Sequence, residues 1–154
     1  MRTLLRENPV RLKERRLTRR VEKSWRSCVH DCLPAWSDIQ KLELGGDWDY
    51  CFTVDLRLSS GFPYFIYMGD SLCRFSNIYL SGRRHCEETL LDIATAKMDE
   101  AALSRAPVFY DSVLRLFNRR RIVFRSVLLP LSGNGADVTH VFGAANGKGG
   151  MPSY

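Results

Sequence analysis

Cys28, His30 and Cys32 lie within five positions of one another and carry side chains that bind zinc. The surrounding residues are typical of a helix, in which positions two apart point about 200° away from each other. The three side chains therefore cannot converge on one ion, as a tetrahedral zinc site requires. Cys28 and Cys32 alone would share a helix face, so we predict no metal site here.

A glycine pattern from Gly143 to Gly149 superficially suggests a phosphate-binding loop. It has three residues between its first two glycines, and neither Ser nor Thr follows Lys148, so it lacks the spacing and the hydroxyl of that motif. We find no Ser, His and Asp set in a recognisable context, and no pair of carboxylates whose roles can be separated. We therefore predict that the chain is not an enzyme and has no catalytic residues.

Composition indicates one soluble domain in the cytoplasm. The 154 residues are 45% hydrophobic and 26% charged, and a chain of this length buries about two-thirds of its unfolded surface. No apolar run approaches the roughly 20 residues that span a bilayer, and no apolar stretch follows the N-terminal charges as in a secretory signal. Five cysteines without a C-x-x-C pair indicate reduced thiols.

The positive charge is concentrated at the N-terminus. Residues 1–26 hold ten Lys or Arg and three Glu, a balance of +7, whereas the other residues hold thirteen basic and fourteen acidic side chains, a balance of −1. Any binding of nucleic acid or of an anionic surface would therefore depend on this segment.

An amphipathic helix is predicted in the same basic segment. The stretch 10–33 contains neither Gly nor Pro and precedes Pro34. Its apolar residues recur three or four positions apart, at Leu17, Val21, Trp25, Cys28, Val29 and Cys32. We favour a helix that packs on a neighbouring element with its charged face in solvent. The alternative is a helix that binds nucleic acid or an anionic surface.

Alternating apolar residues predict strands in the rest of the chain. From Trp48 to Leu58 the alternation is strict, as in a half-buried antiparallel strand. A helix is predicted over 87–104, ending before Pro107. The other predicted strands are 63–68, 108–117, 122–131 and 138–145. This order indicates an α+β domain with a five-stranded antiparallel sheet and helices on one face. The expected parts are a basic helix at 1–33, the domain at 34–145 and a disordered glycine-rich tail at 146–154.

The order of elements and several short motifs resemble those of small stand-alone bacterial PAS-like proteins. The motifs are Ser24-Trp25-Arg26, Leu33-Pro34, Ser37-Asp38-Ile39, Gly69-Asp70-Ser71-Leu72, Leu80-Ser81-Gly82-Arg83, Leu128-Leu129-Pro130-Leu131-Ser132 and Val141-Phe142-Gly143. The resemblance implies a sensory domain in signal transduction, without catalytic residues. The chain departs from the family in one respect, because we expect no attached output domain such as a kinase or cyclase. Its signal would leave through a protein–protein contact, and the expected partners are a second copy and a signalling protein.

In PAS proteins the flanking helix often mediates dimerisation or partner contact. The resemblance therefore implies that Leu17, Val21 and Trp25 form such a contact. A small ligand could gate the domain from a pocket between the sheet and the helices. Strand alternation and helix faces select the residues that would line it: Phe52, Val54, Ile66, Met68, Leu91, Met98, Phe124 and Leu128. The other interpretation is that these residues fill an ordinary core.

The cofactor stays unassigned, and flavin and haem are the two candidates. Cys73-Arg74-Phe75 reproduces part of a flavin-adduct motif resembling Gly-x-Asn-Cys-Arg-Phe-Leu-Gln, but Ser76 and Asn77 depart from it. A haem could take His85, or Cys86 as a thiolate. His30 and His140 have no evident partner in the sequence.

Overall fold

The computed structural model describes residues 16–60, 63–74, 94–115 and 121–148. The N-terminal half holds α1 (Leu17–Arg26), α2 (Trp36–Ile39), the 3₁₀ helix η1 (Gly45–Tyr50), β1 (Cys51–Asp55) and β2 (Phe65–Met68). The C-terminal half holds α5 (Met98–Ser104), β3 (Val108–Arg115), β4 (Arg121–Leu131) and β5 (His140–Lys148). None of the helices in these ranges is long and apolar enough to cross a membrane.

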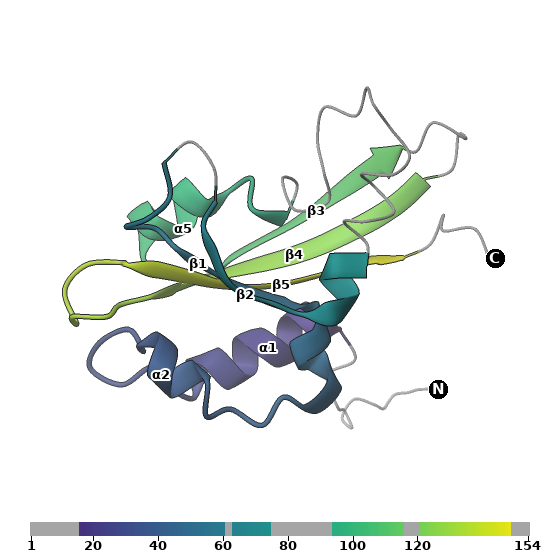
Figure 1. The fold of residues 1–154 in the computed structure, drawn as a ribbon. Helices are drawn as coiled ribbons and strands as arrows, with labels where there is room; N and C mark the ends of the chain where they lie inside the picture. Colours follow the sequence, from purple (N-terminus) through teal and green to yellow (C-terminus); the bar gives the residue numbers. More distant parts are fainter. Residues whose placement is uncertain (1–15, 61–62, 75–93, 116–120, 149–154) are drawn as a thin grey trace, which may run out of the picture.

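The five strands form one antiparallel sheet in the order β2-β1-β5-β4-β3. The first and last strands of the chain, β1 and β5, are therefore neighbours at the centre of the sheet. The predicted fold class, an α+β domain with a five-stranded antiparallel sheet, is confirmed. The prediction placed helices on one face, and the structure has α5 on one face with α1 and α2 on the opposite face (Figure 1).

Alternate side chains of the central strands enter different hydrophobic clusters. On the α5 face, Phe52 of β1 and Val141 of β5 pack in a cluster with residues of α5 and β4. On the α1 face, Cys51 and Phe142 pack in a second cluster with α1 and α2. This alternation follows from the two-residue period of a strand.

The prediction of a half-buried first strand is wrong. All residues of β1 are buried, because α1 covers the face that the alternation assigned to solvent. The strand also begins later than predicted, at Cys51, since Trp48 and Tyr50 belong to η1 and pack with the α1 cluster.

Other predicted boundaries shift by a few residues. Helix α1 ends at Arg26 rather than near residue 33. The predicted helix at 87–104 lies outside the described residues up to 93, a turn occupies 95–97, and α5 ends at Ser104 as expected before Pro107. Strand β5 continues to Lys148, so the predicted tail at 146–154 starts too early.

Glycine at position 143 is required by the packing of β5 on β1. A Cβ atom there would overlap the ring of Phe52, which is paired with Gly143 across the sheet and fully buried. We expect Gly143→Ala to lower the free energy of unfolding by about 1–3 kcal/mol through overpacking. Urea denaturation followed by circular dichroism measures this.

Gly46→Ala is the matched control, because a Cβ atom at position 46 meets no atom within 4 Å. We expect it to change the free energy of unfolding by less than about 0.5 kcal/mol. Equal unfolding midpoints for the two variants would contradict the tight contact between Gly143 and Phe52.

Candidate functional site

The predicted pocket residues fall largely within the cluster on the α5 face. Phe52, Val54, Phe124 and Leu128 are buried there, and Met68 and Met98 pack against its edge. Leu91 lies outside the described residues. The structure thus brings these side chains together between the sheet and α5, which is the arrangement that either a filled core or a ligand site would use.

Ile66 was assigned to the pocket, and this assignment is wrong. Ile66 is 39% exposed. The register of β1 and β2 shifts between Thr53 and Val54, so that Phe65 stands opposite Val54 and packs against the cluster instead. A β-bulge of this kind changes which side chains face inward.

The predicted partner-contact residues are also placed differently from the expectation. Leu17, Val21 and Trp25 are 5%, 0% and 3% exposed, because they pack on the chain's own sheet. The indole Nε1 of Trp25 donates a hydrogen bond to the carbonyl oxygen of Pro130 at 3.1 Å. The contact that the sequence assigned to a partner is therefore intramolecular, and the favoured interpretation of α1 as a packed helix is confirmed.

Much of the described basic face of α1 is engaged within the chain. Arg20 makes two hydrogen bonds to the carboxylate of Asp47, at 2.9 and 2.8 Å. Arg19 stacks on the ring of Phe109, with 4.1 Å from its guanidinium carbon to the ring centre. Arg26 pairs with Glu22. These contacts use cations that the nucleic-acid alternative would need, so the described part of the helix gives that alternative little support.

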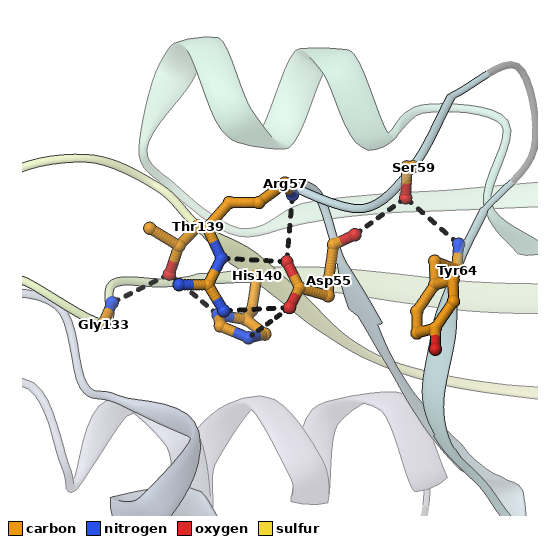
Figure 2. Close-up of polar contacts among 7 residues, drawn as sticks. All are labelled: Asp55, Arg57, Ser59, Tyr64, Gly133, Thr139 and His140. Atoms are coloured by element: carbon orange, nitrogen blue, oxygen red, sulfur yellow. Dashed lines mark hydrogen bonds and ion pairs between the residues drawn. The ribbon is translucent and has the colours of Figure 1, made fainter.

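A polar network with buried Asp55, Thr139 and His140 at its centre lies where β1 ends and β5 begins (Figure 2). The carboxylate of Asp55 accepts hydrogen bonds from the backbone N–H of Arg57 at 2.9 Å and from its guanidinium at 3.0 and 2.9 Å. The backbone carbonyl of Asp55 accepts the hydroxyl of Ser59 at 2.8 Å, and Ser59 accepts the N–H of Tyr64. These bonds close the turn that connects β1 with β2.

His140 joins the same network from β5. Its Nε2 lies 3.5 Å from the carboxylate of Asp55, and its Nδ1 lies 2.7 Å from the hydroxyl of Thr139. That hydroxyl accepts the N–H of Gly133 at 2.8 Å. Its own proton can therefore point to Nδ1, with the imidazole proton on Nε2 toward Asp55. Both Thr139 and His140 are only 7% exposed, so the hydroxyl is enclosed rather than presented to a substrate.

Two opposing effects set the protonation of this network. Hydrogen bonds from Arg57 hold the pKa of Asp55 below its ordinary value, although burial opposes this. Burial lowers the pKa of His140, and the charge of Asp55 only partly offsets that effect. The network is therefore stable with a charged carboxylate and a neutral imidazole.

The segment Pro130–His140, which we call the β4–β5 junction, contacts both helical layers. On the α1 side, Pro130 accepts the Trp25 indole, and the N–H of Ser132 donates to the carbonyl of Pro34 at 2.9 Å. On the α5 side, the guanidinium of Arg105 donates to the carbonyl of Ala136 at 2.8 Å. We take this junction, with the polar network at its end, as the candidate functional site.

The sequence predicted strands on both sides of this junction, at 122–131 and 138–145, but none of the junction's long-range contacts. It left His140 without a partner, which is wrong, since Asp55 and Thr139 both contact it. A signal was present: Asp55 and His140 interrupt apolar strands at positions that pairing of the first and last strands places opposite each other. That pairing was not assigned from the sequence.

The candidate cofactor residues are only partly described. Cys73 is exposed in a helical turn at 70–74, whereas His85 and Cys86 lie outside the described residues. Because α1 ends at Arg26, Cys28 and Cys32 lie beyond it, and the helical argument against zinc does not apply. Within the described ranges, no group of three or more His, Cys, Asp or Glu side chains could hold a metal ion.

No family model matches the sequence, and no curated protein matches it. LOV proteins are among the solved structures with a similar fold. The Rhodobacter sphaeroides LOV protein is 13% identical, with 68% of this chain and 62% of that chain covered and a TM-score of 0.44. The dark structure of the blue-light photoreceptor Aureochrome1 LOV is 13% identical, with 79% and 88% covered and a TM-score of 0.47.

A fungal LOV domain photoreceptor is 14% identical, with 70% of this chain and 81% of that chain covered and a TM-score of 0.42. This chain spans less than two-thirds of the length of the Rhodobacter sphaeroides protein. The strand order β2-β1-β5-β4-β3 follows from the ladders of this chain alone. The described residues form the predicted α+β domain with one five-stranded antiparallel sheet.

The lowered pKa of His140 predicts a loss of stability in acid. The unfolded chain binds the proton more readily than the folded one, so the stabilisation is complete above the ordinary value of 6.5 and falls as the pH drops below it. Asp55, whose pKa is also lowered, adds a second loss at lower pH. We expect His140→Gln to flatten the change in unfolding free energy between about pH 7 and pH 5.

The measurement is urea denaturation at a series of pH values. His30→Gln is the control, because His30 is exposed, and it should keep the wild-type pH dependence. A His140→Gln variant with the same slope as the wild type would show that His140 does not carry this effect.

Proposed function

We propose that this chain is a PAS-like regulatory domain that acts through protein–protein contacts, with α1 as the element that moves. The observation that carries the proposal is the position of the β4–β5 junction. Its Pro130 carbonyl accepts a hydrogen bond from Trp25 of α1, and its Ala136 carbonyl accepts one from Arg105, the residue that directly follows α5. A change on the α5 face can therefore reach α1 through a short segment with directional bonds on both sides.

The sheet supplies a second route between the two faces. Leu128 of β4 packs in the α5-face cluster, and the next residue, Leu129, packs in the α1-face cluster. Val141 and Phe142 of β5 are divided in the same way. Close-packed interiors transmit small displacements because they have few voids to absorb them. A rearrangement around Leu128 would thus alter the surface on which α1 rests.

Helix α1 has the properties of an element that can dissociate from the sheet face on which it packs. It has ten residues, and a helix this short is marginal without tertiary packing. Its release would uncover buried apolar residues of the sheet, among them Cys51, Val127, Leu129 and Phe142. A partner with an apolar surface could bind this face, which would shift the equilibrium toward the released form.

A small ligand on the α5 face is the proposed input. The cluster of Phe52, Phe124 and Leu128 is the place where an apolar ligand would act on β4 directly. Native mass spectrometry of the freshly purified chain tests this part. A bound small molecule would support ligand gating, whereas a bare protein mass would oppose it and leave partner binding as the input.

The coupling itself is tested by Arg105→Gln, which removes the cation that bonds to Ala136 without touching α1. We expect amide hydrogen exchange of residues 17–26 to become about two- to fivefold faster, the effect of losing one exposed hydrogen bond. Mass spectrometry of peptides from these residues gives the readout.

Arg74→Gln is the control, because Arg74 bonds to Ser71 within its own helical turn. It should leave exchange in α1 unchanged. If Arg105→Gln accelerates exchange only in the 132–139 turn, the junction does not couple the two helical layers, and the proposal fails.

A further inference from the structure

Strand β3 forms one edge of the sheet. It pairs over its whole length with β4, from Val108 opposite Leu128 to Arg115 opposite Arg121, and this ladder has no shift in register. The side of β3 that faces away from β4 has no strand partner among the described residues. An open edge of this kind exposes backbone N–H and C=O groups that can pair with another strand.

Some of the features that protect edge strands are absent from β3, whose only charged residues are Asp111 and Arg115. Its sequence, Val-Phe-Tyr-Asp-Ser-Val-Leu-Arg, contains neither Pro nor Lys, and its ladder with β4 has no bulge. The opposite edge differs: β2 has only four residues, and its register with β1 is shifted. Of the two edges, β3 therefore offers the longer and more regular surface for pairing.

We propose that β3 pairs in antiparallel fashion with β3 of a second copy of this chain, about a two-fold axis through Val113. Val113 is 51% exposed, which is unusual for a large apolar residue in a strand. In this register Val113 meets its own equivalent, and Asp111 stands opposite Arg115 of the second copy. Because a two-fold axis repeats every contact, this register contains two pairs of opposite charge, each between Asp111 of one copy and Arg115 of the other.

The charge of Asp111 remains available for this contact. Among the side chains that the structure describes, Arg125 lies 3.9 Å from the Asp111 carboxylate, and the Asp111 side chain is 66% exposed. A register shifted by two residues, about an axis through Ser112, would place Asp111 opposite Val113, with no ion pair. Opposite charges across an antiparallel pair contribute roughly 0.2–1 kcal/mol each, so the charges specify the register while the backbone bonds supply most of the attraction.

This inference deepens the proposed function by naming a second copy as one partner, and it differs from the dimer contact that the sequence suggested. The contact residues lie on β3, not on α1. The predicted association is concentration-dependent, because one pair of edge strands buries less surface than a stable dimer interface.

Sedimentation equilibrium on charge-reversed variants tests the register. Arg115→Asp places two acidic residues opposite each other, and Asp111→Arg places two basic ones. We expect either reversal to raise the dimer dissociation constant by about tenfold, the sum of two lost pairs and two repulsions. The double variant Asp111→Arg/Arg115→Asp should restore it. Asp99→Arg, on an exposed position of α5, is the control.

Disulfide trapping gives an independent readout. In a chain whose Cys28, Cys32, Cys73 and Cys86 are replaced by Ser, Val113→Cys should form a disulfide-linked dimer under mild oxidation. Residues directly opposite in antiparallel strands have Cα atoms about 4.5–5.5 Å apart, within the range for a disulfide. Leu103→Cys is the control, because Leu103 is 85% exposed but lies on α5 and not on the β3 edge that would form the contact.

A wild-type chain that sediments as a monomer at all concentrations would overturn the inference, and so would a dimer that neither reversal weakens. Neither result would affect the proposed coupling, which is measured by hydrogen exchange in Arg105→Gln. That measurement can be repeated in the Arg115→Asp background, so failure of the β3 contact and failure of the regulatory function are distinguishable.

Discussion

Burial of both faces of the two central strands is the constraint on which the rest of the structure depends. Strands β1 and β5 are neighbours, and their side chains alternate between a cluster under α5 and a cluster under α1. Neither face could be left to water without exposing a row of apolar residues. The N-terminal helix is therefore part of the fold, because it supplies the cover that the second face requires.

The same constraint explains the polar network. Once both faces are covered, the polar side chains of β1 and the one at the start of β5 are buried and need partners. Asp55 and His140 obtain them from each other and from Arg57 and Thr139 at the open end of the strands. Thr53, in the middle of β1, has a buried hydroxyl without a hydrogen-bond partner among the described residues. Such a hydroxyl loses its hydrogen bonds to water on folding without replacing them, which lowers the stability of the fold.

The sheet could be predicted from the sequence, but only part of the candidate site could. Alternation located the strands, and the spacing of Leu17, Val21 and Trp25 located the buried face of α1. It could not decide what that face touches, because an amphipathic helix shows the same pattern against a sheet or a partner. The alternation around Trp48 was also misleading, since η1 places aromatic residues near the α1 cluster without a strand. The pairing of β1 with β5 creates the network, and neither strand alone specifies it, although Asp55 and His140 each interrupt an apolar strand.

The central claim is that α1 covers the sheet and can be released, and Cys51 reports on it directly. Its thiol is fully buried beneath α1 and donates a hydrogen bond to the carbonyl of Asp47, and burial raises its pKa. Thiol labelling followed by mass spectrometry compares it with the exposed Cys32 and Cys73. The account predicts rapid labelling of Cys32 and Cys73, slow labelling of Cys51, and much faster labelling of Cys51 in Trp25→Ala while the chain stays folded by circular dichroism. Labelling of Cys51 as fast as that of Cys32 in the wild type would contradict it.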